Sequence, residues 1–416
     1  MLLFRVFSIP VRFFIALLIY FSWGPLAGGV VTAPVPEFSS PALIPYPSKV
    51  VRGAGEAGFR SVHVKVGPDV PGRDDLMREI KDIFRTSGIQ GSLNSGGAAE
   101  GAMTWELFPD ARMKGEGYDL SVGLGKATVR AGSFGGFFNA LQTLRQLVFN
   151  REGEFVMPVV RISDKPAFVL RGIMLDVGRY YMSPALIKEV MRRLSRYKIN
   201  TLHLHLTDDP AWRMEVKKYP ALTDGAFHWK SRLPGRFYTQ AQLKDLTDYC
   251  ARLNIQVIPE IDMPGHSQPF ARAMKTGMQT EKGVSILKDV VDEAVSLFPG
   301  RFFHMGSDEA HISMKDFIPR MAEHIRGKGK EVVVWSPGGP HDKDSVLMCW
   351  GENEAGARMD KNMKRIDSNG FYIDWADSQS GVYQVFFQQP CEVPQGDDKA
   401  LGAIMPVWCD GNLSSE

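Results

Sequence analysis

The chain has few cysteines and no excess of charge of either sign. Only 4 of its 416 residues are cysteine, and their spacing fits no zinc-binding pattern. They allow three disulfide pairings, and buried free thiols are an equally good interpretation. Its 49 lysines and arginines nearly balance its 47 aspartates and glutamates, so the net charge is +2. Basic runs are absent too, which argues against a nucleic-acid partner.

Long apolar runs are also scarce, and the one near the start is short. Arg5 and Arg12 precede the apolar residues 13–21, and small residues follow at 27–29. This order is typical of a secretory signal peptide, and the run is too short for a comfortable transmembrane span. We therefore expect residues 1–33 to be removed on export to the periplasm, the cell surface or the medium, leaving no stable membrane span. A retained anchor is the less favoured alternative.

Residues 34–165 show a mixture of strand and helix patterns. The first of them, to residue 48, are rich in proline and serine and predict an extended entry segment. Beyond it, alternating apolar residues indicate strands, and apolar residues at helical spacing indicate one helix. We expect a small α+β domain with strands at 61–66, 118–122 and 127–130 and a helix at 137–149.

From about residue 166, apolar strands alternate with helices. Ser183 and Pro184 have the residue types preferred at the start of a helix. The alternation predicts a closed parallel (β/α)8 barrel, or TIM barrel, in residues 166–416. The chain stops at Glu416, just past strand eight, so we expect a barrel truncated after that strand. The predicted strands are 172–177, 201–206, 255–259, 301–307, 332–335, 345–350, 370–374 and 403–408, and the helices 184–197, 241–252, 285–298 and 314–327.

The most informative motif follows the predicted fourth strand, at residues 304–309. Asp308 and Glu309 are adjacent carboxylates at the end of a buried strand, where burial and like charge both disfavour ionisation. Such a pair can hold one acid protonated while the other stays ionised. The alternative is a strand end that meets solvent with two ordinary acids. A metal site using His304, Glu309 and His311 is disfavoured because no helical HExxH arrangement is present. We expect neither metal nor cofactor.

Side chains able to bind a ligand follow nearly every predicted barrel strand. The carboxyl ends of barrel strands meet at one mouth, so these side chains are expected to converge. Carboxylates and aromatic rings together suit a carbohydrate, whose rings have apolar C–H faces and whose hydroxyls need acceptors. Each tryptophan also fits core packing, and His203 and His205 fit either a buried hydrogen-bonded pair or substrate contacts. The strand-end residues are Asp176, Arg179, Asp208, Asp209, Glu260, Asp262, His266, Asp308, Glu309, Trp335, Trp350, Tyr372, Asp374, Trp408 and Asp410.

These residues resemble glycoside hydrolase family 20, the β-N-acetylhexosaminidases. The resemblance covers nearly the whole chain after the leader. In the small domain it rests on residues 44–47, 116–120 and 142–147. In the barrel it rests on residues 171–172, 259–266, 304–309, 372–374 and 408–410.

The resemblance implies an exo-acting enzyme that removes terminal GlcNAc or GalNAc from glycans or chitooligosaccharides with retention. In that mechanism the substrate's own 2-acetamido oxygen attacks the anomeric carbon. Glu309 would be the general acid and base, and Asp308 would orient the acetamido group and stabilise positive charge. Arg171 would bind hydroxyls of the terminal sugar. The other implied substrate-binding residues are Asp209, His266, Trp335, Trp350, Tyr372, Asp374, Trp408 and Asp410.

Three positions depart from the family pattern. Ser307 replaces a common second glycine, Pro210 follows Asp208 and Asp209 where glutamine is usual, and Asp410 replaces a common glutamate. Two other functions compete with the first. One is a catalytically silent carbohydrate-binding protein on the same scaffold. The other is a glycosidase that uses two enzyme carboxylates, Asp308 or Glu309 together with Glu260.

Overall fold

The structure is a computed structural model that describes residues 42–93, 98–351, 359–372 and 388–410. The residues described from Leu43 onward belong to one compact unit. The predicted signal peptide and Asp374 lie outside the described residues. None of the described helices has the length and apolar character needed to cross a membrane.

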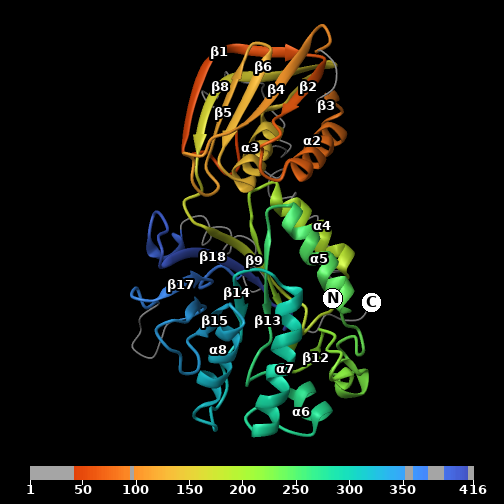
Figure 1. Ribbon diagram of the computed structural model, residues 1–416, viewed down its shortest axis with the longest axis vertical. Coiled ribbons are helices and arrows are strands. Elements are labelled where there is room, and N and C mark those ends of the chain that lie inside the picture. Colours follow the sequence, from red (N-terminus) through yellow and green to blue (C-terminus); the bar gives the residue numbers. More distant parts are fainter. Residues whose placement is uncertain (1–41, 94–97, 352–358, 373–387, 411–416) are drawn as a thin grey trace, which may run out of the picture. The chain divides into compact units, whose positions relative to one another are not determined.

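The first half of the unit is a mixed sheet with two helices (Figure 1). Helix α3 packs on β5 and β6 and contacts α2. The strands and the helix predicted here are present, whereas β1, α2, β3, β4, β7 and β8 were not predicted. Helix α2 could have been predicted, because its apolar residues Leu76, Ile80 and Ile83 have helical spacing. The sheet order is β1 (Lys49–Phe59), β8 (Glu154–Asp164), β5 (Tyr118–Gly123), β6 (Lys126–Ala131), β4 (Ala102–Pro109), β2 (Ser61–Val66) and β3 (Gln90–Leu93), with β7 (Phe149–Arg151) on β8, and the helices are α2 (Arg73–Ser87) and α3 (Phe134–Leu147).

The second half is a closed barrel of eight parallel strands, as predicted. Its strands, in order around the barrel, are β9 (Leu170–Asp176), β10 (Thr201–His205), β13 (Gln256–Glu260), β14 (Phe302–His304), β15 (Glu331–Ser336), β16 (Val346–Cys349), β17 (Lys364–Asp367) and β18 (Ala400–Val407). The helices are α4 (Pro184–Ser195), α5 (Gln240–Arg252), α6 (Gln268–Met274), α7 (Glu281–Leu297) and α8 (Phe317–Gly327). Short elements are β11 (Thr207–Asp208), β12 (Ala211–Trp212), η1 (Pro220–Thr223), η2 (Gly225–Phe227) and η3 (Pro390–Glu392).

The position predicted for the seventh strand is wrong. We expected it at 370–374, but the strand that pairs with β16 and β18 is Lys364–Asp367. Two charged residues, Lys364 and Arg365, interrupt the apolar pattern that marks a buried strand. Gly370 and Tyr372 follow the strand instead and reach the barrel mouth.

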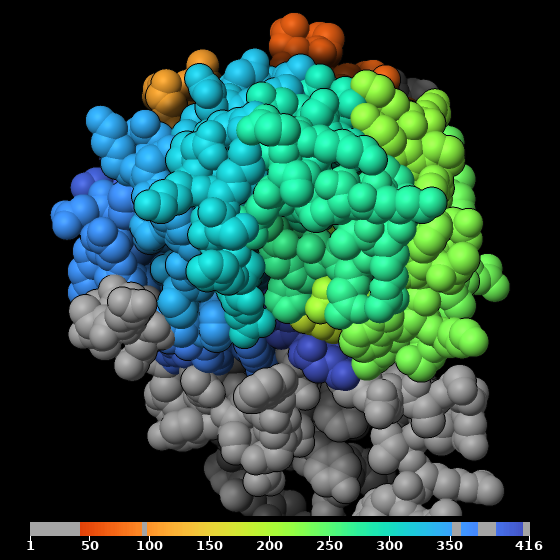
Figure 2. All heavy atoms as spheres, turned by 90° about the horizontal axis from the view of Figure 1, so that it is seen from below, coloured from red at the N-terminus to blue at the C-terminus, as the bar shows by residue number. Residues whose placement is uncertain are grey.

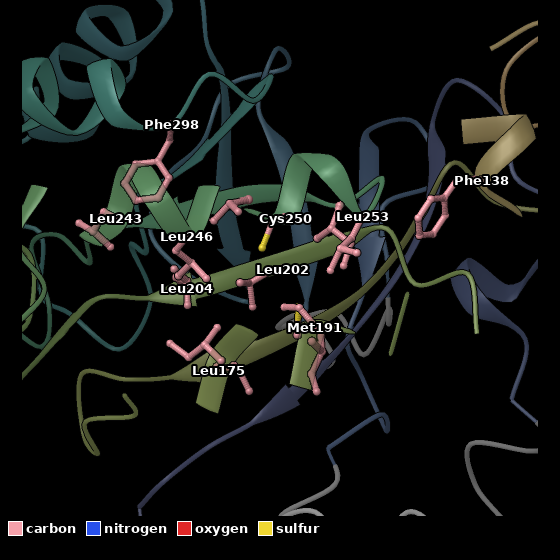
Figure 3. Close-up of a cluster of buried hydrophobic side chains, with 14 of the residues drawn as sticks. Phe138, Leu175, Met191, Leu202, Leu204, Leu243, Leu246, Cys250, Leu253 and Phe298 are labelled. Carbon is pink, nitrogen blue, oxygen red and sulfur yellow. The ribbon is translucent and has the colours of Figure 1, made fainter. Parts of the chain in front are cut away.

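The barrel strands divide their side chains between two layers because successive residues point to opposite faces. On β10, Leu202 and Leu204 lie beside Leu246 and Cys250 of α5, in the layer between strands and helices (Figure 3). The alternate residues, His203 and His205, are buried on the other face, inside the barrel. A second apolar cluster fills the barrel interior and includes Met174, Ile258, Val333, Met348, Ile366 and Ile404. The barrel interior beneath the mouth is therefore a packed apolar core, and the polar residues at the strand ends lie directly above it.

Arg171 lies at the beginning of β9, at the end of the barrel opposite its mouth. Its Nη2 donates to Glu116 of the small domain at 2.5 Å, Nε to the Lys198 carbonyl at 2.9 Å and Nη1 to the Phe168 carbonyl at 2.7 Å. Asp176, at the other end of the strand, is five residues further along, about 17 Å at 3.3 Å per residue. The prediction that Arg171 binds the terminal sugar is therefore wrong. Its guanidinium joins the two halves of the unit.

Arg171→Ala should lower stability without weakening sugar binding. It removes one of several donors from Glu116 and one donor from each of two backbone carbonyls, and such a loss at a partly buried site costs roughly 1–3 kcal/mol. Denaturant unfolding should show that loss, while KM for an N-acetylhexosaminide stays within about twofold of the native value, because surface and distant substitutions rarely alter a site. A large increase in KM at unchanged stability would contradict this assignment.

Candidate active site

The carboxyl ends of the barrel strands surround a cavity of about 600 Å³. It is lined by Arg179, His205, Asp208, Asp262, His266, Asp308, Glu309, Trp335, Trp350, Asn369, Gly370, Tyr372, Trp408 and Asp410. Figure 2 shows the molecule from below: turquoise residues of the α6–α8 region lie in the middle, with the green segment after β12 to one side and blue residues to the other. Of the predicted site residues, Asp308, Glu309, His266, Trp335, Trp350, Tyr372, Trp408 and Asp410 come together here. Their roles remain predictions.

A tight loop after β14 directs the two adjacent acids toward the cavity. Gly306 has a φ of 69°, and a Cβ there would lie 1.8 Å from Oδ1 of Asp262, so only glycine fits. Ser307 has a φ of 84°, which a non-glycine residue adopts only with strain. The Ser307 hydroxyl is buried and has no hydrogen-bond partner among the described residues. Serine at this position therefore costs stability that glycine, which adopts a positive φ without strain, would not.

Glu309 is the more exposed of the two acids and lies beside a charged histidine. Its side chain is 59% exposed, and Oε2 lies 3.3 Å from Nε2 of His266. The other ring nitrogen of His266 lies 3.7 Å from Oδ1 of Asp208. The nearby carboxylate of Asp208 raises the pKa of His266 to about 10, despite partial burial. His266 is therefore protonated at neutral pH and places a positive charge next to Glu309.

Asp308 lies deeper in the cavity, among other acids. Burial and the nearby charge of Glu260 raise the pKa of Asp308 to about 7. Burial also raises the pKa of Asp262 well above its usual range. Single ligand atoms of Asp262, His266 and Asp308 lie within 4.8 Å of one another. Asp308 is thus a carboxyl group that changes charge near neutral pH, next to a more exposed acid.

Asp308→Asn should stabilise the folded protein at neutral and higher pH. The folded-state pKa of Asp308, about 7, exceeds the ordinary aspartate value of 3.8, so the folded state binds the proton more tightly than the unfolded state. The cost of the buried charge is fully present above pH 7, shrinks as pH falls through 7, and is gone near pH 4. Removing the charge should gain roughly 2–4 kcal/mol at pH 8 and much less at pH 5.

Unfolding midpoints of native and Asp308→Asn protein at both pH values measure this difference. Glu309→Gln is the matched control, because removing an exposed carboxylate changes stability little. A gain that is equal at pH 5 and pH 8 would contradict the raised pKa.

Arg179 forms another corner of the cavity; it was among the strand-end side chains expected at the mouth, but the sugar-binding role was assigned to Arg171 instead. The three guanidinium nitrogens of Arg179 each lie 3.0 Å from a carboxylate oxygen, of Asp176, Asp208 and Asp410. The ring of Trp408 lies 5.0 Å from its guanidinium carbon. The sequence contained a signal that distinguishes the two arginines. Arg179 comes three residues after the end of β9, where side chains reach the mouth, whereas Arg171 lies at the start of the strand.

Asp209 does not line the cavity, so its predicted binding role has no support in its position. Oδ1 of Asp209 accepts the backbone N–H of Gln268, at the start of α6, at 3.2 Å. Its neighbour Asp208 lines the cavity instead. Single ligand atoms of Asp208, Asp209 and His266 lie within 4.8 Å of one another, so the two acids are neighbours, and the sequence alone does not say which of them reaches the cavity.

Glu260 lies at the centre of a buried cluster beneath the cavity. Its Oε1 accepts Nε1–H of Trp335 at 2.8 Å and lies 3.2 Å from Nδ1 of His304, and its Oε2 lies 2.7 Å from Nδ1 of His205. Burial opposes ionisation, but His205 and His304 still hold the pKa of Glu260 well below its usual range. Glu260 does not line the cavity. Its position therefore argues against a role as a nucleophile.

The same cluster contains residues close enough together to hold a metal ion. His203, Glu260 and His304 each offer a ligand atom, and these atoms lie within 4.8 Å of one another. Burial lowers the pKa of His203 to about 4, whereas the neighbouring acids outweigh burial and raise that of His205 well above its usual range. A protonated His205 thus balances the charge of Glu260, so this carboxylate is satisfied without a metal ion.

Aromatic rings form one wall of the cavity. The ring centroids of Trp335 and Trp408 are 5.6 Å apart, and those of Tyr372 and Trp408 are 6.3 Å apart. Trp350 donates its indole N–H to the Pro337 carbonyl at 3.0 Å. The sequence suggested either core packing or ligand contact for the tryptophans. Both apply to Trp335, which is almost fully buried, and all of these rings contribute to the cavity lining.

Two family models match the chain. "Glycosyl hydrolase family 20, domain 2" matches residues 40–165, and "Glycosyl hydrolase family 20, catalytic domain" matches residues 168–282. A beta-hexosaminidase of Porphyromonas gingivalis is 32% identical over 381 residues, which covers 73% of this chain and 49% of the relative. A beta-N-acetylhexosaminidase of Cellulomonas fimi is 30% identical over 286 residues, covering 62% and 58%. The chain thus spans about half to three fifths of the length of these curated relatives.

Solved structures show the same architecture. The Streptomyces plicatus N-acetyl-beta-hexosaminidase in complex with Thio-NAglucal matches with a TM-score of 0.77 at 25% identity, covering 90% of this chain and 86% of that one. A mutant of the Streptomyces plicatus beta-hexosaminidase in complex with its product, GlcNAc, matches with a TM-score of 0.75 at 27% identity, covering 88% and 85%. The two family models together match more than half of the chain. The chain therefore belongs to glycoside hydrolase family 20.

Proposed function

We propose that the protein is an exo-acting β-N-acetylhexosaminidase that removes terminal GlcNAc or GalNAc from glycans or chitooligosaccharides. The observation that carries the proposal is the pairing of a partly buried Asp308 with an exposed Glu309 in a cavity walled by tryptophans. An acid that hydrolyses a glycoside must reach the leaving oxygen, and Glu309 is the accessible member of the pair. The aromatic wall suits the apolar face of a sugar or of its acetamido methyl group.

The proposed mechanism is retaining and assisted by the substrate. The acetamido oxygen attacks the anomeric carbon, which gains from proximity because both groups belong to one sugar. Glu309 protonates the leaving oxygen and then removes a proton from the attacking water. Asp308 accepts the acetamido N–H and stabilises the positive charge that develops on the intermediate. Tyr372 donates a hydrogen bond to the acetamido oxygen.

His266 and Asp208 support Glu309 in this scheme. The positive charge of His266 lies 3.3 Å from Oε2 of Glu309 and offsets the negative charge that remains after proton transfer. Asp208 in turn keeps His266 protonated. The corner formed by Arg179 and Asp410 supports exo action, because its charged groups line the cavity and suit the free hydroxyls of a terminal sugar.

Hydrolysis of chromogenic N-acetylglucosaminide and N-acetylgalactosaminide tests the proposal. Release from either sugar, with none from the matching glucoside that lacks the acetamido group, is the expected result. Cleavage of the glucoside instead would favour a mechanism with two enzyme carboxylates. Binding of GlcNAc without any hydrolysis would favour the silent carbohydrate-binding protein.

We also propose that the protein is exported. The charged, apolar and small-residue order of residues 1–33 supports export. Fractionation of producing cells, with N-terminal sequencing of the mature chain, tests it. A cytosolic protein that retains Met1 would contradict it.

A further inference from the structure

A buried arginine ties the turn that carries Arg179 to a loop outside the cavity. The loop is residues 225–236, between β12 and α5. Arg213, directly after β12, is fully buried and lines no part of the cavity. Its guanidinium donates to five backbone carbonyls: Val177 at 3.0 Å, Gly178 at 3.3 Å, Leu233 and Arg236 at 2.8 Å, and Arg232 at 2.6 Å. It therefore holds the loop against the residues just before Arg179.

Arg232 extends this connection from the loop to the end of β18. Its side chain is 7% exposed, and it also lies outside the cavity lining. Nη1 donates to the Cys409 carbonyl and Nη2 to the Asp410 carbonyl, both at 2.8 Å. The carboxylate of Asp410 then meets Nε of Arg179 at 3.0 Å. The turn after β9, the loop and the end of β18 thus form a closed ring of contacts, which we call the arginine clasp: Arg213, Arg232, Asp410 and Arg179.

The clasp lies across the barrel mouth from Glu309. β14, which precedes Glu309, and β18, which precedes Asp410, are four strands apart in a closed ring of eight. They therefore stand on opposite sides of the mouth. If Glu309 acts at the anomeric carbon, Arg179 and Asp410 face the distal edge of the sugar ring. GlcNAc and GalNAc differ only in the configuration of the hydroxyl at C4, which lies at that edge.

We propose that Arg232 is a positioning residue that sets the discrimination between GlcNAc and GalNAc. The inference rests on the proposed function. The side chain of Asp410 is short and 54% exposed, so surrounding side chains do little to hold it, and its place depends on its backbone and on Arg179. Arg232 holds that backbone through two carbonyls. A shift of about 1 Å in such a contact can cost a hundredfold, because hydroxyl recognition depends on geometry.

Arg232→Ala, with Arg236→Ala as the matched control, tests the proposal. Arg236 lies in the same loop and carries the same charge, but it is exposed and contributes its backbone carbonyl to the clasp, which the substitution keeps. In Arg232→Ala the ratio of kcat/KM for the chromogenic GlcNAc and GalNAc glycosides should change about tenfold or more, chiefly through KM. In Arg236→Ala the ratio should stay within about twofold of the native value.

Arg232→Lys keeps the charge and can reach one carbonyl, so it should shift the ratio by an intermediate amount. If Arg232→Ala does not fold, the ratio measured for Arg232→Lys tests the proposal instead. An unchanged ratio in a folded variant, or an equal loss on both sugars, would overturn the inference. A native protein that hydrolyses neither glycoside would instead overturn the proposed function, and the inference with it.

Discussion

Glu309→Gln should abolish hydrolysis of substrates with poor leaving groups, such as a disaccharide of N-acetylglucosamine. These substrates need the proton most, and loss of a positioned general acid typically costs about 10²–10⁴-fold. The exposed carboxylate of Glu309 faces the cavity beside the positive charge of His266, so glutamine keeps the shape and loses only the transferable proton. Aryl glycosides with good leaving groups should lose about tenfold or less in the first step, since they leave without a proton.

Single-turnover rates on both substrate classes separate the first step from the second. Glu189→Gln on the outer helix α4 makes the same change on an exposed face and should alter neither rate. Equal losses for good and poor leaving groups would argue that Glu309 is not the acid.

Asp308→Asn should lower turnover on N-acetyl sugars by about 10²–10³-fold, the usual cost of removing a group that stabilises transition-state charge. The carboxylate is needed as positive charge develops on the acetamido group, so the loss should fall on kcat more than on KM. The same substitution should stabilise the folded protein above pH 7, because burial raises the pKa of Asp308 to about 7. A variant that is both more stable and less active distinguishes a catalytic role from damage to the fold.

A cyclic thiazoline that mimics the proposed intermediate provides the second measurement. It should inhibit the native protein and bind Asp308→Asn more weakly. Asp248→Asn, an exposed substitution on α5, should leave both turnover and inhibition unchanged. A covalent sugar trapped on Asp308 or Glu260, or indifference to the thiazoline, would falsify the substrate-assisted mechanism.

Local pattern determined most of the barrel. Seven of the eight strands could be predicted because buried parallel strands read as short apolar runs between helices. The seventh strand, Lys364–Asp367, begins with two charged residues, so the prediction placed it wrongly at 370–374. In the small domain, β1 was missed because Lys49, Arg52 and its glycines obscure any alternation.

The sequence by itself determined the family, the barrel and the adjacent acids Asp308 and Glu309, because these depend on local order and short motifs. Only the tertiary structure decided which arginine faces the cavity. Arg171 and Arg179 are eight residues apart, and a strand between them carries the first to the opposite end of the barrel. It also decided that Asp208 rather than Asp209 lines the mouth. The tertiary structure likewise decided the raised pKa of Asp308 and the clasp contacts of Arg213 and Arg232. Burial and contacts between distant segments exist only once the chain has folded.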